Sequence, residues 1–424
     1  MSDSLFSSAL VALIFRVTGV GLVAFLNLMI AWKAGAEFAG YFFSALAILM
    51  IASVASRLGL DLVILRRISQ AAGNDDMVAA REYLRKASLF VAATGTLTAS
   101  LLILLAHKQA IWPTSEAYLL FGFMISSLPF LSVASLVSEA FKGLGAAHSS
   151  VLVLSVIPPG VTLMVLEFAV QFAGPKGIGM AYFAATAFGS VAAYSLLLFR
   201  TRNNCKAQEN PSLFTCLREA RPLWLLMTIN RGLLPWLVFP LLAIFATSEE
   251  VGQFGMATRV AMLVGLPLVC IEAVLAPRFA HLHQMRDLRQ MCSLGKRCSL
   301  FGLLATSPGL LILLAPEPVM SIFGAEFIGA APVLIILVLG QFANAAFGSV
   351  GLCLTMTGNG KDAAIASFFS LSVLAFCAIF LIPAHGATGA AMATAAGLIS
   401  NRLVGAIFLY RSFGFALFPS WVRA

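Results

Sequence analysis

Residues 5–32 read LFSSALVALIFRVTGVGLVAFLNLMIAW, and Arg16 is the one charged side chain among them. A helix needs about 20 apolar residues to cross the hydrocarbon core of a bilayer, and this stretch is long enough. An arginine near the centre of such a span costs about 2.5–3.5 kcal/mol on insertion scales. We therefore expect a transmembrane helix in which Arg16 faces protein or water and has a task there.

The composition of the whole chain indicates the same class. Hydrophobic residues make up 60% of the sequence and charged residues 11%, and the mean hydropathy is +0.96. These values exclude a soluble protein, and the long apolar runs between charge clusters exclude the short alternating strands of a membrane β-barrel. We predict an all-α polytopic membrane protein.

The first apolar segment also has to be weighed as a cleaved signal peptide. Ala34-Gly35-Ala36 has the small residues of a cleavage site. However, no basic residue precedes the apolar run, and Arg16 interrupts it. We expect this segment to be retained as a helix.

Hydropathy places about twelve transmembrane helices in the chain. They are expected at 8–31, 38–65, 87–106, 115–138, 149–171, 177–199, 221–246, 252–276, 299–315, 328–356, 363–383 and 387–410. The connections are short except at 66–86, 200–220 and 277–298, and we expect those three to be loops. No segment is large enough for a separate soluble domain.

The basic residues outside the helices are strongly asymmetric. Nineteen lysines and arginines fall on one side of the predicted membrane and three on the other, namely Lys33, Lys108 and Lys176. The positive-inside rule then places both termini and the three long connections in the cytoplasm. The net charge of +9 is accordingly a topology signal, and we predict no nucleic-acid partner.

The two halves of the sequence repeat each other. Asp61 and Arg67 correspond to Glu272 and Arg278 at an offset of 211 residues, and three glycine-containing segments match in the same order at similar offsets. Six helices return the chain to its starting side, so the repeat has parallel topology with its pseudo-two-fold axis along the membrane normal. We predict two six-helix lobes, residues 1–207 and 208–424.

At this point the chain resembles the exporter superfamily that contains multidrug (MATE) exporters and polysaccharide-lipid flippases, the MOP superfamily. Two stretches are similar to the O-antigen and exopolysaccharide flippases: GSVGLCLTMTGNGK at 348–361, and the small-residue segment from Gly386 to Ala396. The resemblance implies a bacterial inner-membrane flippase for an undecaprenyl-diphosphate-linked oligosaccharide. It further implies alternating access of a cleft lined by helices 1, 2, 7 and 8, and a polysaccharide polymerase as a partner.

Five arginines lie inside the predicted helices, and we take them as candidates for binding the diphosphate of such a lipid: Arg16, Arg57, Arg231, Arg259 and Arg402. Guanidinium suits phosphate because it is always charged and donates two parallel hydrogen bonds. Each residue also has a structural interpretation. Arg57 precedes Asp61 by one helical turn and would form a local pair, Arg259 would extend to the outer interface, and Arg402 is on a helix whose place at the cleft is uncertain.

Further polar residues occur on the same helices. Four amides are candidates for lining the polar cavity: Asn27, Asn230, Gln341 and Asn344. Gln341 and Asn344 share a face of one helix and are candidates for hydrogen bonds to sugar hydroxyls, with hydrogen bonds between helices as the alternative for such amides. Coupling to protons or sodium requires a carboxylate linked to the cleft, and Glu167 and Asp61 are the candidates. For Glu167 the alternative is an ion pair with a neighbouring helix.

Other chemistry finds little support in the sequence. Gly358-Asn359-Gly360-Lys361 lacks the upstream glycine of a P-loop, so no ATPase is implied. No nucleophile, base and orienting acid can be assembled from the sequence, and we expect neither an enzyme nor a cofactor. His281 and His283 are expected to be solvated loop residues rather than metal ligands. Two rivals to the flippase stay open: a MATE-type multidrug exporter, which would be expected to carry acids in its lobes, and a membrane glycosyltransferase or ligase, which usually needs a larger outer loop.

Overall fold

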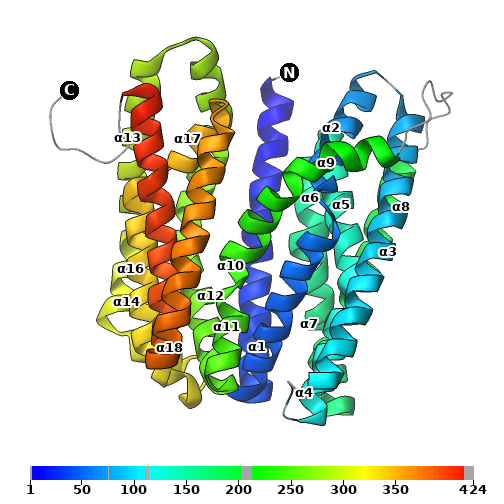
Figure 1. Cartoon of the computed structure of the whole chain (residues 1–424), viewed down its shortest axis with the longest axis vertical. Coiled ribbons are helices and arrows are strands. Elements are labelled where there is room, and N and C mark those ends of the chain that lie inside the picture. The colour runs from blue at the N-terminus through cyan, green and yellow to red at the C-terminus, as the bar shows by residue number, and fades with distance from the viewer. Residues whose placement is uncertain (1, 75, 110–111, 113, 202–212, 415–424) are drawn as a thin grey trace. The chain divides into compact units, whose positions relative to one another are not determined.

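The computed structural model describes residues 2–74, 76–109, 112, 114–201 and 213–414. These residues form helices joined by short turns, and no β-strand occurs among them (Figure 1). The chain divides into two compact units, Met1–Ala34 with Tyr41–Trp236 and Gly35–Gly40 with Leu237–Ala424. Residues 213–236 thus pack in the first unit. The lobe boundary at residue 207, which we derived from the internal repeat, stays a prediction.

The first unit contains the helices from α1 to α10, apart from the α1 segment Gly35–Gly40. Its elements are α1 (Ser2–Ser56), α2 (Leu60–Gly73), α3 (Met77–Gln109), α4 (Ser115–Ser126), α5 (Leu128–Gly143), α6 (Ala147–Val151), the π-helix η1 (Leu152–Val156), α7 (Ile157–Ala173), the 3₁₀ turn η2 (Gly174–Lys176), α8 (Gly177–Arg200), α9 (Leu213–Met227), the π-helix η3 (Thr228–Leu233) and α10 (Leu234–Trp236). Helix α5 lies at the centre, packed against α2, α3 and α8. Its fully buried Leu136 and Phe141 belong to the core of this unit.

The second unit contains the rest of the chain and the short α1 segment Gly35–Gly40. Its elements are α11 (Val238–Phe245), α12 (Ser248–Gln284), α13 (Leu288–Thr306), the 3₁₀ turn η4 (Ser307–Gly309), α14 (Leu310–Leu314), α15 (Pro316–Ser321), the 3₁₀ helix η5 (Ala325–Ala330), α16 (Ala331–Phe347), α17 (Val350–Met356) and α18 (Gly360–Phe413). Helix α16 packs against α12, α13 and α18. A separate core around Phe279, Met291 and Leu354 joins α12, α13 and α17.

Length and apolarity identify eight membrane-crossing helices in the described residues, or nine when Phe214–Trp236 and Val238–Phe245 count as one span. Three of them, Ile14–Ser56, Ala147–Phe199 and Gly360–Phe413, have 43, 53 and 54 residues. Helices of that length would extend roughly 65–80 Å, more than twice the hydrocarbon thickness. Each is interrupted by a glycine with positive φ, at Gly35, Gly174 and Gly386. Counting these three as two spans each gives the twelve that the sequence predicted.

The prediction of long loops was wrong for two of the three connections. Helix α2 continues to Gly73 and α3 begins at Met77, while α12 continues to Gln284 and α13 begins at Leu288. The polar residues there are good helix formers, so helices extend beyond the apolar part of the sequence. At the third connection, residues 202–212 lie outside the described residues. His281 and His283 are therefore helical residues of α12.

The break at Gly35 lies in a tight contact within the second unit. Gly35 has φ 73°, which interrupts α1, and the freed Ala36 N–H donates to the Glu326 carboxylate at 2.7 Å. One turn later Gly40 packs directly on α12, where a Cβ added to Gly40 would lie 2.6 Å from the Ser248 carbonyl carbon. A Cβ added to Gly252 would likewise lie 3.1 Å from the Gly40 nitrogen. The glycines permit backbone-to-backbone packing here.

Candidate functional site

Arg57 lies at a sharp break in the chain, and its guanidinium is buried. Helix α1 ends at Ser56, Leu58 and Gly59 have φ 50° and 79°, and α2 starts at Leu60. Arg57 Nε donates to Asp61 Oδ2 at 3.0 Å, and another guanidinium nitrogen donates to Ser53 Oγ at 2.7 Å. Arg57 is 5% exposed and Asp61 1%. The local pair that the sequence left as the alternative is therefore present.

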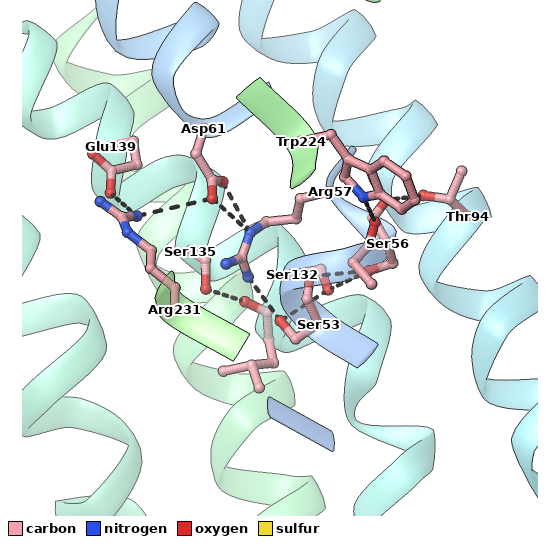
Figure 2. A network of polar contacts seen from close by, with 12 residues as sticks. Ser53, Ser56, Arg57, Asp61, Thr94, Ser132, Ser135, Glu139, Trp224 and Arg231 are labelled. Atoms are coloured by element: carbon pink, nitrogen blue, oxygen red, sulfur yellow. Dashed lines mark hydrogen bonds and ion pairs between the residues drawn. The ribbon is translucent and has the colours of Figure 1, made fainter. Parts of the chain in front are cut away.

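Arg231 approaches the same carboxylate from another helix, as Figure 2 shows. It belongs to η3, and π-helical segments often occur at functional sites. Its guanidinium donates to Glu139 Oε1 at 2.8 Å and lies 3.9 Å from Asp61 Oδ2. Lys142 also contacts Glu139, at 3.0 Å. Sequence reasoning missed the Arg231–Glu139 pair because its members are 92 residues apart.

The network in the first unit therefore contains three cations and two carboxylates: Arg57, Lys142, Arg231, Asp61 and Glu139. Of the two arginines, Arg57 is enclosed, whereas the Arg231 side chain is 42% exposed. Asp61 has a further peculiarity. Arg57 Nε is 2.9 Å from Asp61 Oδ1, but only Oδ2 receives a well-aligned hydrogen bond, which leaves Oδ1 buried without one.

Serine hydroxyls and a tryptophan surround this network (Figure 2). Ser53 and Ser56 each lie 3.2 Å from the Ser132 hydroxyl on α5. Trp224 of α9 donates from Nε1 to the Ala55 carbonyl at 3.0 Å, satisfying a backbone acceptor at the end of α1. The hydroxyl and indole contacts fix Arg57 and its helix break in place.

Arg402 is the centre of a smaller network in the second unit. Its Nε donates to Asn344 Oδ1 at 2.6 Å, and its guanidinium lies 3.8 Å from Glu272 Oε1. The Asn344 amide is 3.4 Å from Gln341 Oε1. The structure thus brings three predicted site residues, Arg402, Asn344 and Gln341, together. The Arg402–Asn344 contact joins α18 to α16, which is the alternative for such amides, whereas the Asn344–Gln341 contact lies within α16.

The last two arginines differ from the others in their surroundings. Arg16 is an exposed residue of α1, and within the described part of the chain it forms no ion pair with a carboxylate. Arg259 is a half-buried residue of α12 whose guanidinium lies 3.8 Å from the Met262 sulfur. Among the five arginines predicted inside the membrane, Arg16 is therefore the one most available to an anionic ligand.

The other predicted site residues have local partners. Asn27 is 3% exposed and donates to the Val23 carbonyl at 2.7 Å, while Asn230 is exposed and donates to the Leu226 carbonyl at 3.1 Å. Glu167 forms an ion pair with Lys33 at 2.7 Å, and its side chain is 52% exposed. The pair between neighbouring helices, which the sequence left as the alternative for Glu167, is therefore present.

The chain was compared with known proteins by sequence and by structure. No protein-family model matches the sequence. A curated relative, the probable low-salt glycan biosynthesis flippase Agl15 of Haloferax volcanii, is 27% identical over 176 residues, which cover 41% of this chain. The match spans 37% of the length of Agl15.

The solved structures that resemble this chain cover nearly all of it. An inward-facing MATE family multidrug resistance transporter of the MOP superfamily has a TM-score of 0.74 at 15% identity, covering 96% of this chain and 98% of its own. The lipid II flippase MurJ, in an inward closed conformation, has a TM-score of 0.73 at 13% identity, covering 95% and 87%. A MOP superfamily transporter from Pyrococcus furiosus, described as having reverse polarity of its binding pocket, has a TM-score of 0.70 at 15% identity, covering 96% and 95%.

The class of protein follows from these likenesses. The chain is a multi-pass membrane protein with the two-lobe, twelve-helix fold of the MOP superfamily, as the sequence resemblance implied. The curated relative named above is a probable flippase of glycan biosynthesis. At these identities the solved structures establish the fold alone, and the cargo has to be argued from this chain's own residues.

Proposed function

We propose that this chain is a flippase that moves an undecaprenyl-diphosphate-linked oligosaccharide from the cytoplasmic to the outer leaflet of a bacterial inner membrane by alternating access. Both termini would be cytoplasmic, and the product would pass to a polysaccharide polymerase for O-antigen or exopolysaccharide synthesis. The flippase relative and the positive-inside charge distribution support this proposal. We propose no enzymatic reaction.

Arg16 is the observation that carries the proposal. A cationic side chain inside a membrane span is costly, and most of the other intramembrane arginines here have a carboxylate or amide neighbour. Arg16 is exposed instead, which favours contact with a mobile anion such as the diphosphate of a carrier lipid. Arg231 is the second candidate because its side chain is 42% exposed despite its partners.

The remaining arginines receive different roles. Arg57 is buried between Asp61 and Ser53, so we assign it to holding the break between α1 and α2. Arg402 is assigned to positioning α16 through Asn344. Arg259 stays a candidate for cargo contact in the second unit, and its test is the same as that for Arg16.

Transport by the purified chain tests the proposal directly. Proteoliposomes would carry the full chain and a polyprenyl-diphosphate oligosaccharide, and flipping would be measured as exposure of the glycan to an added lectin. Because charge-assisted hydrogen bonds contribute about 1.5–3 kcal/mol, we expect Arg16→Gln to slow flipping roughly tenfold to a hundredfold. Arg16→Lys keeps the charge but loses the bidentate geometry, so its flipping rate should lie between those of the wild-type chain and Arg16→Gln.

The control variant removes a positive charge outside the proposed site. Arg289 is an exposed arginine of α13, and Arg289→Gln should flip at the wild-type rate. Flipping by Arg16→Gln at the wild-type rate would remove this residue from the site. An inactive wild-type chain in the same vesicles would refute the cargo assignment itself.

Ion coupling is proposed for Asp61, with Glu167 as the second candidate. The buried Asp61 Oδ1 without a hydrogen bond would be satisfied by a proton or a small cation. Flipping by wild-type vesicles should then respond to an imposed proton or sodium gradient, and Asp61→Asn should lose that response. If Glu167 couples instead, Glu167→Gln loses the response and Asp61→Asn keeps it.

A MATE-type multidrug exporter is the alternative function. The carboxylates Asp61 and Glu139 in the first unit favour it, since acids suit cationic cargo. Expression in a strain without its own exporters separates the two proposals. Protection against cationic drugs that Asp61→Asn abolishes supports the exporter, whereas unchanged drug sensitivity with active flipping supports the flippase.

A further inference from the structure

A cavity of about 540 Å³ lies between the ends of α12 and α13, and its lining includes none of the arginines discussed above. The two helices form a tight hairpin in the second unit. Seven residues line the cavity: Arg278, His281, Leu282, Gln290, Ser293, Leu294 and Arg297. From its polar residues, the sequence predicts a loop in this region.

The spacing of the lining residues shows that one face of each helix forms the cavity. Positions 278, 281 and 282 of α12 are related by i, i+3 and i+4, and positions 290, 293, 294 and 297 of α13 by i, i+3, i+4 and i+7. A three-residue turn turns these faces toward each other. Asp287 holds that turn, because its N–H donates to the Leu282 carbonyl at 3.1 Å and its carboxylate accepts the Gln290 N–H at 2.9 Å.

The cavity is cationic and its charge is not compensated. Arg278 and Arg297 face it together with His281, and none of its described lining residues is acidic. Among the described residues neither guanidinium forms an ion pair, in contrast to Arg57 and Arg231. Gln290 and Ser293 add hydrogen-bond donors. Two guanidinium groups and neutral donors in one cavity suit an oxyanion, above all phosphate.

The surface next to the cavity indicates that the phosphate belongs to a lipid. Phe301 and Leu304 follow Arg297 at i+4 and i+7, so they lie on the same face of α13. These two side chains are 63% and 58% exposed, and they lie in the candidate span Leu288–Leu314. An acyl chain attached to a phosphate in the cavity would run along this apolar stripe.

We propose that the α12–α13 hairpin is a binding site for the phosphate headgroup of an anionic glycerophospholipid of the cytoplasmic leaflet. Arg278 and Arg297 would bind the phosphate oxygens, and Phe301 would contact an acyl chain. The leaflet follows from the predicted topology, since this hairpin carries five of the basic residues on the positive side. The site is independent of the proposed cargo and of Arg16.

A lipid-binding assay with a charge-matched control tests this site. The full chain would be purified in a zwitterionic detergent with phosphatidylcholine, and phosphatidylglycerol binding would be titrated by native mass spectrometry. We expect Arg278→Gln combined with Arg297→Gln to weaken binding about tenfold or more. Arg289→Gln combined with Lys296→Gln removes the same charge from the same hairpin outside the cavity, and binding should change less than about twofold.

Three outcomes would overturn the proposal. Equal weakening in both double variants would show that only net charge matters. The thermal unfolding temperature of the full chain would also be measured with inorganic phosphate and with phosphatidylglycerol. An equal rise in that temperature with both would make a soluble anion the ligand. Should the cavity variant fail to fold, a photoreactive phosphatidylglycerol can be crosslinked to the wild-type chain. Labelling should fall on α13 around Phe301, and labelling elsewhere only would refute the site.

Discussion

The contact between Gly40 and α12 gives the sharpest prediction about stability. Gly40 and Gly252 occupy corresponding positions of the repeat, and the structure packs them against each other's helices. A methyl group on Gly40 would overlap the Ser248 carbonyl, whose backbone atoms cannot rotate away as a side chain can. Gly40→Ala therefore forces the two helices apart.

The size of the destabilisation can be derived by comparison with a glycine that has space for a methyl group. Gly122 in α4 has no heavy atom within 4 Å of an added Cβ. Replacing it by alanine should stabilise the helix by about 0.5–1 kcal/mol, because glycine makes the unfolded chain more flexible than alanine does. Gly40→Ala receives the same gain but adds an overpacking cost of about 1–3 kcal/mol. The two variants should thus differ by about 1–3 kcal/mol in the free energy of unfolding.

The measurement is denaturant unfolding of the full chain in mixed micelles, followed by tryptophan fluorescence. Gly252→Ala should destabilise the same contact, since its Cβ would lie 3.0 Å from the Ala36 carbonyl carbon. Once one alanine has separated the helices, the second costs less, so the double variant should lose less than the sum of the two. A Gly40→Ala protein as stable as Gly122→Ala would refute this packing argument, and so would strict additivity.

Three further predictions concern the polar contacts. Arg231→Gln should destabilise the chain by about 1–2 kcal/mol, less than a fully buried pair would, because Arg231 is partly exposed. Adding Glu139→Gln should restore the stability of the chain. If the stable double variant still flips slowly, Arg231 contacts the cargo. If its flipping rate returns to that of the wild-type chain, the role of Arg231 is structural. Glu326→Ala should cost about 1–3 kcal/mol in unfolding experiments because the Ala36 N–H loses its acceptor, and an unchanged stability would contradict that role. Glu167→Gln should leave the midpoint of denaturant unfolding unchanged, as expected for an exposed ion pair, and a lowered midpoint would show that the pair is structural.

The membrane architecture could be predicted because its causes are local. A span depends on the length of an apolar run, which is read directly from neighbouring residues. The sidedness that the basic residues indicate stays a prediction. The repeat that relates Asp61 to Glu272 was likewise visible at a constant offset. The helical hairpin of α12 and α13 was missed because polar residues beyond the bilayer were taken as loop, although their helix propensity is good.

The chain's order of residues alone thus determined the class, the twelve spans and the list of arginines inside them. It could not determine which of these arginines are neutralised. Arg231 meets Glu139 across 92 residues and Arg402 meets Asn344 across 58, and such pairs exist only once the helices are packed. The physical reason is that burial in a membrane can be estimated from composition, whereas the energy of a charge depends on neighbours within a few ångströms. Only the tertiary structure could separate the exposed Arg16 from the enclosed Arg57.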